Sequence, residues 1–386
     1  MSLTVRGCNR ATLARQLLLE RHDLAPAAAV ARVVALQAQE PASVHLALWA
    51  RVAGLTAGDV DRALAGAEVV RTTLMRGTLH AVRAADHATF HRAMTPTLRA
   101  QRLNDRRYRA TDLPVATADE LLTELLAWAD EPRTNADAEA WLADHGVDDP
   151  MVWWAMRSYG PLLRAVDPDT PWSFSTSTAT YVARDDGPAV HVPDEVADEA
   201  LAVLVERHLA AFGPATTGDV SRFAMVPKRR LTPVVAAMGD RLVTYEGHDG
   251  RVLLDVPDGP LPDEDTPAPP RLLPMWDSVL FAHEDRTWII DDDVRSLVIR
   301  RNGDTLPTVL VDGRVVGVWR PAPEGGAGVE VTTFRPVADE DWELLADEAA
   351  SLLAFVGDRD PKLYGRYRRW WDRLPDPVER RLLTSG

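Results

Sequence analysis

The stretch DEVADEALAVLVERHLAAFGPATTGDVSRFAMVPKRRLTPVVAAMGDRLVTYEGHDGRVLLDV, residues 194–256, carries the clearest fold signal in the chain. It begins with an amphipathic helical pattern that stops at Gly213. A short helix capped by Thr216 or Thr217 follows, and then a second helix that ends at Gly239. Two alternating runs around the turn GHDG predict a β-hairpin. Helix, helix-turn-helix and hairpin in this order predict a winged-helix module.

The same order of elements recurs twice toward the N-terminus, although less regularly. Repetition of one supersecondary unit predicts tandem winged helix-turn-helix modules and a mainly helical α+β fold. The predicted helices cover residues 10–22, 27–40, 43–52, 57–67, 118–129, 135–146 and 151–162, and the predicted strands cover 68–75, 78–83 and 172–184. The corresponding domains are 1–110, 111–193, 194–256 and a C-terminal β-hairpin and helical region, 271–386.

The C-terminal region is separated from these modules by a segment rich in proline and acidic residues, 255–271, which predicts an exposed connector. Asp312-Gly313 between two alternating runs is the strongest short-range hairpin signal in the chain. Residues 338–357 predict a helix. The segment 362–374, KLYGRYRRWWDRL, is basic and aromatic.

The composition is that of a soluble globular protein. The chain has 386 residues, 46% hydrophobic and 26% charged, with no apolar run of the roughly 18 residues that a membrane helix needs. Its start has no signal-peptide pattern, and the single cysteine, Cys8, excludes intramolecular disulfides and thiolate metal cages. HExxH, Walker and GxSxG motifs are absent. We therefore expect a cytoplasmic protein with no metal and no cofactor.

The charges are distributed unevenly along the chain. The overall net charge is −15, but residues 1–110 contain 16 arginines and only 8 acidic residues. Such asymmetry is typical of a protein with one face that meets a polyanion. Alternatively, the two parts of the sequence do not correspond to two faces. Only Lys228 and Lys362 are lysines.

The stretch ALQAQEP, residues 35–41, places two uncharged amides, Gln37 and Gln39, near the end of an apolar helical pattern. A glutamine has no useful pKa, but its carbonyl and amino groups can orient a water molecule or a substrate oxygen. Pro41 disfavours helical geometry at Glu40, so we expect the pair at a helix C-terminus where both side chains converge. The alternative is that Gln37 is a buried structural amide and Gln39 is solvated.

Clusters of cations lie beside several predicted elements. Arginine contacts phosphates through forked hydrogen bonds, although each cluster alone is more typical of a solvated face. Several clusters beside winged-helix elements favour DNA. His80 is a weaker candidate for a phosphate or base contact, with a structural role as the alternative. The candidate DNA-binding residues are Arg76, His80, Arg99, Arg102, Lys228, Arg229, Arg230, Arg300, Arg301 and Arg314.

Four stretches together resemble the AlkZ/YcaQ-like family of bacterial winged-helix DNA glycosylases: residues 36–51, 75–82, 272–286 and 309–320. One branch of that family carries Gln-x-Gln and the other Gln-x-Asp, so Gln37 and Gln39 resemble the AlkZ branch. The resemblance implies tandem winged helices in a C-shaped arrangement, with double-stranded DNA in the channel. It also implies a C-terminal hairpin that enters the duplex, here the strands around Asp312-Gly313.

The resemblance further implies a function. Members of the AlkZ branch protect producers of DNA-crosslinking natural products, azinomycin B among them. The chain is then expected to be a monomer that hydrolyses the N-glycosidic bond of N7-alkylguanine and unhooks interstrand crosslinks. Gln37 and Gln39 would position the water that attacks the sugar.

Two other functions fit a winged-helix protein. A ligand-sensing transcription regulator would bind DNA sequence-specifically and leave modified bases in place, but we find no strong candidate for a dimerisation helix. A resistance protein that sequesters the alkylator would bind the drug without DNA. The glutamine pair beside basic clusters favours the enzyme.

Overall fold

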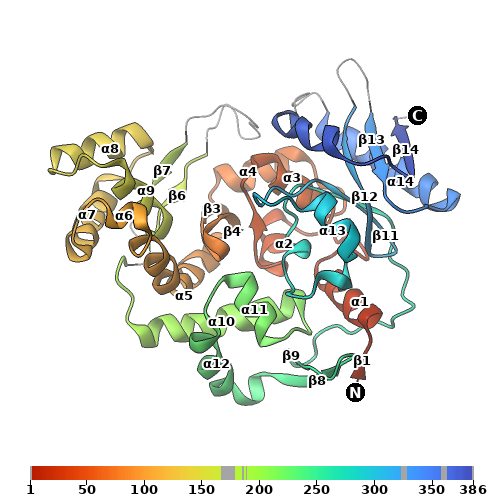
Figure 1. Cartoon of the computed structure of the whole chain (residues 1–386), viewed down its shortest axis with the longest axis horizontal. Coiled ribbons are helices and arrows are strands. Elements are labelled where there is room, and N and C mark those ends of the chain that lie inside the picture. Colours follow the sequence, from red (N-terminus) through yellow and green to blue (C-terminus); the bar gives the residue numbers. More distant parts are fainter. Residues whose placement is uncertain are drawn as a thin grey trace.

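The computed structural model describes residues 2–166, 179–184, 187, 189–322, 328–357 and 363–384, and it is shown in Figure 1. Helices predominate, with three separate β-sheets, so the predicted α+β class is confirmed. No helix in these ranges is long and apolar enough to cross a membrane.

The helices and strands have the following bounds. The α-helices are α1 Val5–Arg15, α2 Pro26–Arg32, α3 Pro41–Trp49, α4 Ala57–Ala65, α5 Ala84–Leu103, α6 Arg106–Arg109, α7 Val115–Trp128, α8 Asn135–Asp144, α9 Pro150–Tyr159, α10 Asp194–Phe212, α11 Thr217–Ala224, α12 Lys228–Ala237, α13 Asp292–Val298 and α14 Asp339–Val356. The 3-10 helices are η1 Met75–Gly77, η2 Gly239–Arg241, η3 Ser278–Leu280, η4 Arg286–Trp288 and η5 Gly365–Arg373. The strands are β1 Ser2–Leu3, β2 Leu36–Gln37, β3 Val69–Thr73, β4 Leu79–Arg83, β5 Arg133–Thr134, β6 Leu163–Arg164, β7 Thr180–Val182, β8 Val243–Gly247, β9 Val252–Asp255, β10 Arg271–Leu273, β11 Thr308–Val311, β12 Arg314–Pro321, β13 Val329–Thr333 and β14 Glu379–Leu383.

The elements predicted over 194–256 are all present, as α10, α11, α12 and the hairpin β8–β9. Thr216 is the N-cap of α11, and it exchanges hydrogen bonds with Asp219 in a capping box, which satisfies two donors at the helix start. The N-terminal strand β1 pairs in parallel with β8 and enlarges this hairpin to three strands. The chain terminus therefore lies beside the hairpin (Figure 1).

The helix predicted over 27–40 is wrong in its second half. Helix α2 ends at Arg32, Val34 adopts a left-handed backbone with φ 70°, and Leu36–Gln37 form strand β2. A continuous apolar run does not distinguish a buried strand from a buried helix. Here pairing with β4 supplies the hydrogen bonds, and Pro41 keeps Glu40 extended at φ −114°.

The first two predicted modules share one sheet. Its six strands lie in the order β2-β4-β3-β6-β7-β5, so strands from residues 36–83 and 133–182 are continuous across it. Only part of the strand predicted over 172–184 lies within the described residues, where β7 confirms it. A single apolar core also extends from β3 and α5 through α9 to α10–α12, so these segments pack as one body.

The C-terminal region forms a five-stranded antiparallel sheet in the order β10-β11-β12-β13-β14, partly covered by α14 (Figure 1). Asp312 and Gly313 connect β11 and β12, with φ of 46° and 75°, which confirms the predicted hairpin. The core beneath this sheet includes side chains from α1 and α3. The region therefore packs directly against the segment that carries the glutamine pair.

Candidate functional site

Gln37 lies in strand β2, directly opposite His80 of β4. The Ala38 N–H continues the ladder by donating to the Leu79 carbonyl at 2.8 Å. Extended backbone places residues two positions apart on the same side of the chain, which a helix does not. Gln37 is 7% exposed, whereas Gln39 is exposed. Gln37 therefore lies in a strand and Gln39 in the bend that follows it, so the predicted helix C-terminus is wrong. The buried Gln37 and the exposed Gln39 match the alternative expectation for their burial.

The carbonyl of Gln37 is held by Arg76. Arg76 Nη2 donates to Gln37 Oε1 at 2.9 Å and contacts His80 Nε2 at 3.2 Å, while its Nη1 donates to the Phe223 carbonyl at 3.1 Å. The guanidinium also lies 5.3 and 5.4 Å from the ring centroids of Phe223 and Phe281. Three hydrogen bonds and two aromatic rings thus fix one cation against one amide oxygen.

His80 completes this network as a neutral ring. It is fully buried, and its Nδ1 lies 2.9 Å from the Thr78 carbonyl, so Nδ1 carries the proton and Nε2 accepts from Arg76. Burial, together with the positive charge of Arg76, lowers the pKa of His80 to about 3. Burial likewise lowers the pKa of Arg76 to about 10, which leaves the guanidinium charged at neutral pH.

These contacts decide which end of the Gln37 amide faces outward. Because Oε1 accepts from Arg76, the amino group points the other way. Gln37 Nε2 makes no hydrogen bond to a described residue, yet it is not among the polar atoms sealed from solvent. Gln37 therefore offers a donor to the surface, and the exposed amide of Gln39 can rotate to offer an acceptor.

Residues of the stretch 272–286 contact the backbone before Gln37 and the side chains that support it. Ser278 Oγ donates to the Ala35 carbonyl at 3.0 Å, just before β2. Asp277 forms a bidentate ion pair with Arg51 at 2.8 Å, and both side chains are fully buried. Phe281 lies against Arg76. Two segments far apart in the sequence thus form one support for the glutamines.

Glu40 ties the motif to the C-terminal segment. Its carboxylate is 1% exposed and forms an ion pair with Arg366 of η5 at 2.5 Å. Tyr364, two residues earlier, contacts Ser43 of α3 at 3.1 Å and accepts from the Met275 N–H at 3.2 Å. Burial raises the pKa of Tyr364, so its hydroxyl stays protonated. The basic, aromatic segment around η5 therefore anchors the residues directly after Gln39.

Two of the predicted DNA contacts, His80 and Arg76, make their polar contacts within the fold. His80 is fully buried and cannot contact a phosphate or base. The guanidinium of Arg76 donates to Gln37 and to the Phe223 carbonyl and contacts His80, so its hydrogen bonds are made within the fold. Both residues come from the hairpin β3–β4, whose turn folds the Arg76 side chain back onto the sheet.

Five further predicted contacts are partly buried and engaged in the fold. Arg99 pairs with Asp119, and Arg230 pairs with Asp198 at 2.9 Å. Arg102 lies 4.8 Å from the Trp154 ring centroid. Arg300 donates to the Trp370 carbonyl at 3.0 Å, and Arg314 donates to the Thr287 carbonyl at 2.9 Å. Each of these guanidinium groups is still partly exposed, but its contacts within the protein fix its orientation.

The remaining three predicted contacts, Lys228, Arg229 and Arg301, are exposed. Lys228 lies 3.9 Å from Glu284, a weak contact. Arg229 and Arg301 have no ion pair within the described ranges. The structure therefore leaves these cations on α12 and after α13 available for a polyanion, and their contact with DNA stays a prediction.

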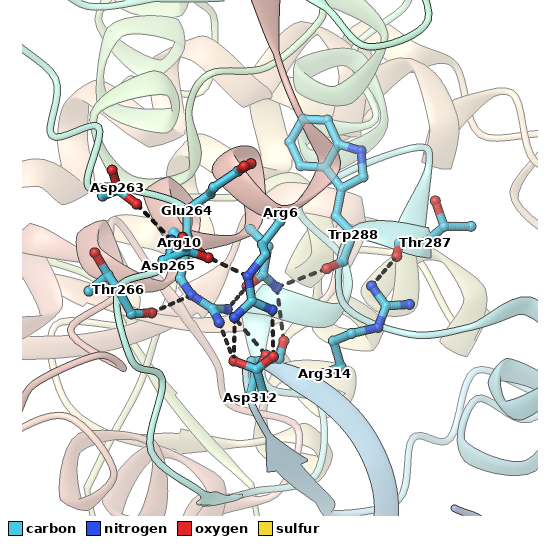
Figure 2. A network of polar contacts seen from close by, with 12 residues as sticks. Arg6, Arg10, Asp263, Glu264, Asp265, Thr266, Thr287, Trp288, Asp312 and Arg314 are labelled. Carbon is cyan, nitrogen blue, oxygen red and sulfur yellow. Dashed lines mark hydrogen bonds and ion pairs between the residues drawn. The ribbon is translucent and has the colours of Figure 1, made fainter.

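The tip of the Asp312-Gly313 hairpin is attached to α1, as Figure 2 shows. Arg6 Nη2 donates to Asp312 Oδ1 at 3.1 Å, and Arg10 pairs with the same carboxylate. Asn9 Nδ2 donates to the Gly313 carbonyl at 2.9 Å. Two positive charges hold the pKa of Asp312 below its usual range, against the effect of burial. Entry of this tip into a duplex would break these contacts, and that role of the hairpin stays a prediction.

The sequence analysis missed the residues that support the glutamines. Glu40 and Arg366 pair across the fold, and Phe223 and Phe281 enclose Arg76. The available local signal is Glu40, a charged residue between Gln39 and Pro41. Pro41 restricts the backbone at Glu40 and so limits where its side chain can point. The partners lie far apart in the chain, with a smallest separation of 147 residues, between Arg76 and Phe223, and they have no local signature.

The ring of Phe223 rests on His208 of α10, with centroids 4.7 Å apart. Both ring nitrogens of His208 are buried without a hydrogen bond to any described residue, and burial lowers its pKa to about 3. The unfolded chain binds a proton near pH 6.5 that the folded chain does not, so stability is lost as pH falls below 6.5.

We therefore expect His208→Phe to flatten the acid dependence of stability. In the parent protein, His208 alone should cost roughly 1–2 kcal/mol between pH 6.5 and 5. The phenyl ring keeps the packing and removes the titration. Urea unfolding at pH 7.0, 6.0 and 5.0 measures this; an identical pH slope in parent and variant would contradict it.

Comparison with known proteins agrees with this architecture. The sequence profile described as DNA glycosylase AlkZ-like matches residues 30–355. An interstrand DNA cross-link repair glycosylase of Streptomyces sahachiroi is 27% identical over 331 residues, which is 79% of this chain and 84% of that protein. The structure of the Streptomyces sahachiroi DNA glycosylase AlkZ has the same fold, with a TM-score of 0.76 at 22% identity over 93% of this chain and 98% of the other. The profile match spans most of the sequence and includes Gln37, Arg76 and the stretch 272–286, so the chain belongs to the AlkZ-like family of DNA glycosylases.

Proposed function

We propose that this DNA glycosylase hydrolyses the N-glycosidic bond of N7-alkylated guanine in double-stranded DNA, including guanine in an interstrand crosslink. The related cross-link repair glycosylase of Streptomyces sahachiroi supports the substrate class. The observation that carries the proposal is the Arg76–Gln37 hydrogen bond, because it fixes one amide beside the exposed amide of Gln39. In a producing organism this activity would give resistance to an alkylating natural product such as azinomycin B.

The chemistry of the lesion explains why two amides suffice. Alkylation at N7 puts a positive charge on guanine, so the base leaves as a neutral molecule and needs no general acid. Breaking the bond gives a sugar with oxocarbenium character. What the protein must supply is a water molecule held at C1′ in the right orientation. Uncharged amides do this without placing a charge that must be desolvated.

The structure refines the role of each glutamine. Gln37 Oε1 is occupied by Arg76, so Gln37 would hold the water oxygen through its amino group. The carbonyl of Gln39 would then accept a hydrogen bond from the same water molecule. Together the two contacts would point a lone pair of the water oxygen at C1′. Only Gln39 can place a carbonyl dipole near the developing positive charge.

The reaction would be monofunctional. Schiff-base chemistry requires an amine close to C1′. Among the described residues the only lysine is Lys228, which lies on α12 beside Glu284. The product would accordingly be an abasic site.

DNA would approach along the elements that flank the glutamines. We infer tandem winged-helix modules, within 1–110, 111–193 and 194–256, arranged as a C around the duplex, with the 271–386 region beside them. The exposed cations Lys228 and Arg229 of the third module and Arg301 of the C-terminal region support this path. A crosslinked guanine is tied to the opposite strand, so full extrusion into a closed pocket is sterically hard and an approach from a groove is favoured.

The test uses a duplex with one N7-methylguanine and a second duplex with one N7-linked interstrand crosslink. Alkali after incubation should break the methylated strand of the first duplex at the lesion. Denaturing gels should show that the two strands of the second duplex have separated. Intact strands in both duplexes would refute the proposal. Breakage of the first alone would restrict it to monoadducts.

Arg366→Gln should slow base release without loss of the fold. The variant removes the cation that pairs with Glu40, so the carboxylate is left buried and the backbone after Gln39 is less fixed. We expect a roughly ten-fold lower single-turnover rate and a lower melting temperature. A matched control is Arg62→Gln, an exposed arginine on α4 paired with Asp59, which should change neither. Equal rates for Arg366→Gln and Arg62→Gln would contradict a positioning role.

A further inference from the structure

Arg286 lies beside the glutamine site, and no residue in the described part of the chain forms an ion pair with it. It begins η4, and its guanidinium carbon lies 5.2 Å from the centroid of the Phe281 ring. The guanidinium of Arg76 lies 5.4 Å from the same centroid. Phe281 therefore contacts both the cation that holds Gln37 and the cation of Arg286.

Arg286 is surrounded by positive charge. Burial lowers its pKa to about 10, and the charges of Arg222 and Arg295 lower it in the same direction. Arg222 comes from α11, next to Phe223, and its side chain is exposed. Arg295 is paired with Asp292 at 2.9 Å. Like charges at such a position are unfavourable unless an anion joins them.

No described residue satisfies the Arg286 side chain. It has no ion pair and no hydrogen bond within the described ranges, and its Nε is buried without a partner. A buried donor left unsatisfied costs free energy. The Nε atoms of Arg51, Arg71, Arg102 and Arg300 are also buried without a described partner, but Arg286 shares the Phe281 ring with the arginine that holds Gln37. Such a group next to a functional site points to a ligand that binds there.

The nearby carboxylates are directed elsewhere. Asp285 accepts from Thr287 Oγ1 at 2.6 Å and pairs with Arg251 at 3.4 Å. Glu284 is half-exposed and lies toward Lys228. The sequence thus places two acidic residues immediately before Arg286, and the fold keeps both from neutralising it.

We propose that Arg286, together with Arg222, binds one phosphate of the DNA strand next to the damaged nucleotide. This inference rests on the proposed function, since it assigns a contact at the same site. A guanidinium with free donors matches a phosphate by two parallel hydrogen bonds. Arg286 and Arg222 are called the clasp below. Phe281 contacts both Arg286 and Arg76, so the phosphate bound by the clasp sets the distance between the DNA strand and Gln37.

The experiment compares Arg286→Gln and Arg222→Gln with Arg380→Gln, an exposed arginine of β14 on the C-terminal sheet. Affinity for an undamaged duplex is measured from 50 to 300 mM salt. Each clasp variant should bind roughly ten-fold more weakly, and the slope of log affinity against log salt should fall by about 1. Arg380→Gln should match the parent.

A scan of neutral methylphosphonates then locates the phosphate. Substrates carry one methylphosphonate at successive positions on either side of an N7-methylguanine. One position should slow base release by the parent roughly ten-fold and slow release by Arg286→Gln no further. Independent, multiplicative effects at every position would overturn the assignment, as would parent-like binding by both clasp variants.

The readouts separate this inference from the proposed function. If the parent released no base, the function would fail, but the salt dependence on undamaged DNA would still report the phosphate contact. Arg222 is exposed, so Arg222→Gln keeps the test valid even where Arg286→Gln lowers the melting temperature.

Discussion

Gln37→Ala is expected to lower the single-turnover release of N7-methylguanine from duplex DNA by about 100- to 1000-fold, the scale on which loss of one preorganised donor slows an enzyme. The variant removes both the acceptor for Arg76 and the amino group that would hold water. Gel analysis of alkali-cleaved strands over time, with protein in excess, gives the rate.

The control for Gln37→Ala is its fold and its affinity for DNA. Loss of one hydrogen bond to a charged group should reduce the free energy of unfolding by about 1–3 kcal/mol. Binding to undamaged duplex should change less than three-fold, because Gln37 is almost fully buried. A rate within five-fold of the parent would remove Gln37 from the mechanism.

Arg76→Met is expected to combine loss of stability with loss of activity. Methionine fills much of the space between Phe223 and Phe281 but leaves Gln37 Oε1, His80 Nε2 and the Phe223 carbonyl without their donor. Removing one member of such a buried polar group typically costs about 3–5 kcal/mol. With its carbonyl free, the Gln37 amide can flip so that its amino group no longer faces the water. Base release should therefore fall roughly 10- to 100-fold.

Thermal melting and single-turnover kinetics together test the Arg76 prediction. The variant is almost fully folded at least about 20 °C below its melting temperature. Assays in that range therefore separate slow chemistry from unfolding. Arg76→Lys keeps the charge but cannot make all three hydrogen bonds, so it should lie between parent and Arg76→Met. Parent-like release by Arg76→Met would show that the amide orientation is irrelevant.

Local sequence signals predicted much of the fold. The capping of α11 by Thr216, the hairpin β8–β9 and the Asp-Gly turn at 312–313 all follow from residues close in sequence. Turn chemistry and helix caps are set by a few neighbouring side chains, so one sequence suffices for them. The glutamine pair was also proposed in this way, from two amides at positions where a core favours apolar residues, and its role stays a proposal.

Tertiary pairing explains where the sequence analysis failed. Strand β2 exists because β4 supplies its ladder, and nothing local reports that partner. The contacts of Arg76 could not be predicted locally, because its partners Phe223 and Phe281 come from α11 and the stretch 272–286. The Asp312-Gly313 tip looked free because Arg6 and Arg10 of α1 lie 300 residues away. The positions of the free cations could only be learned from the fold.

Gln37→Glu measured against Gln39→Glu on one duplex with a single N7-methylguanine tests the central claim most directly. Glutamate at 37 still accepts from Arg76 but has no amino group, whereas glutamate at 39 keeps the acceptor that would face the water. The account predicts that Gln37→Glu loses at least about 100-fold in single-turnover rate while Gln39→Glu stays within about ten-fold of the parent. Equal loss in both variants, or a fully active Gln37→Glu, would contradict a water molecule held between a donor at 37 and an acceptor at 39.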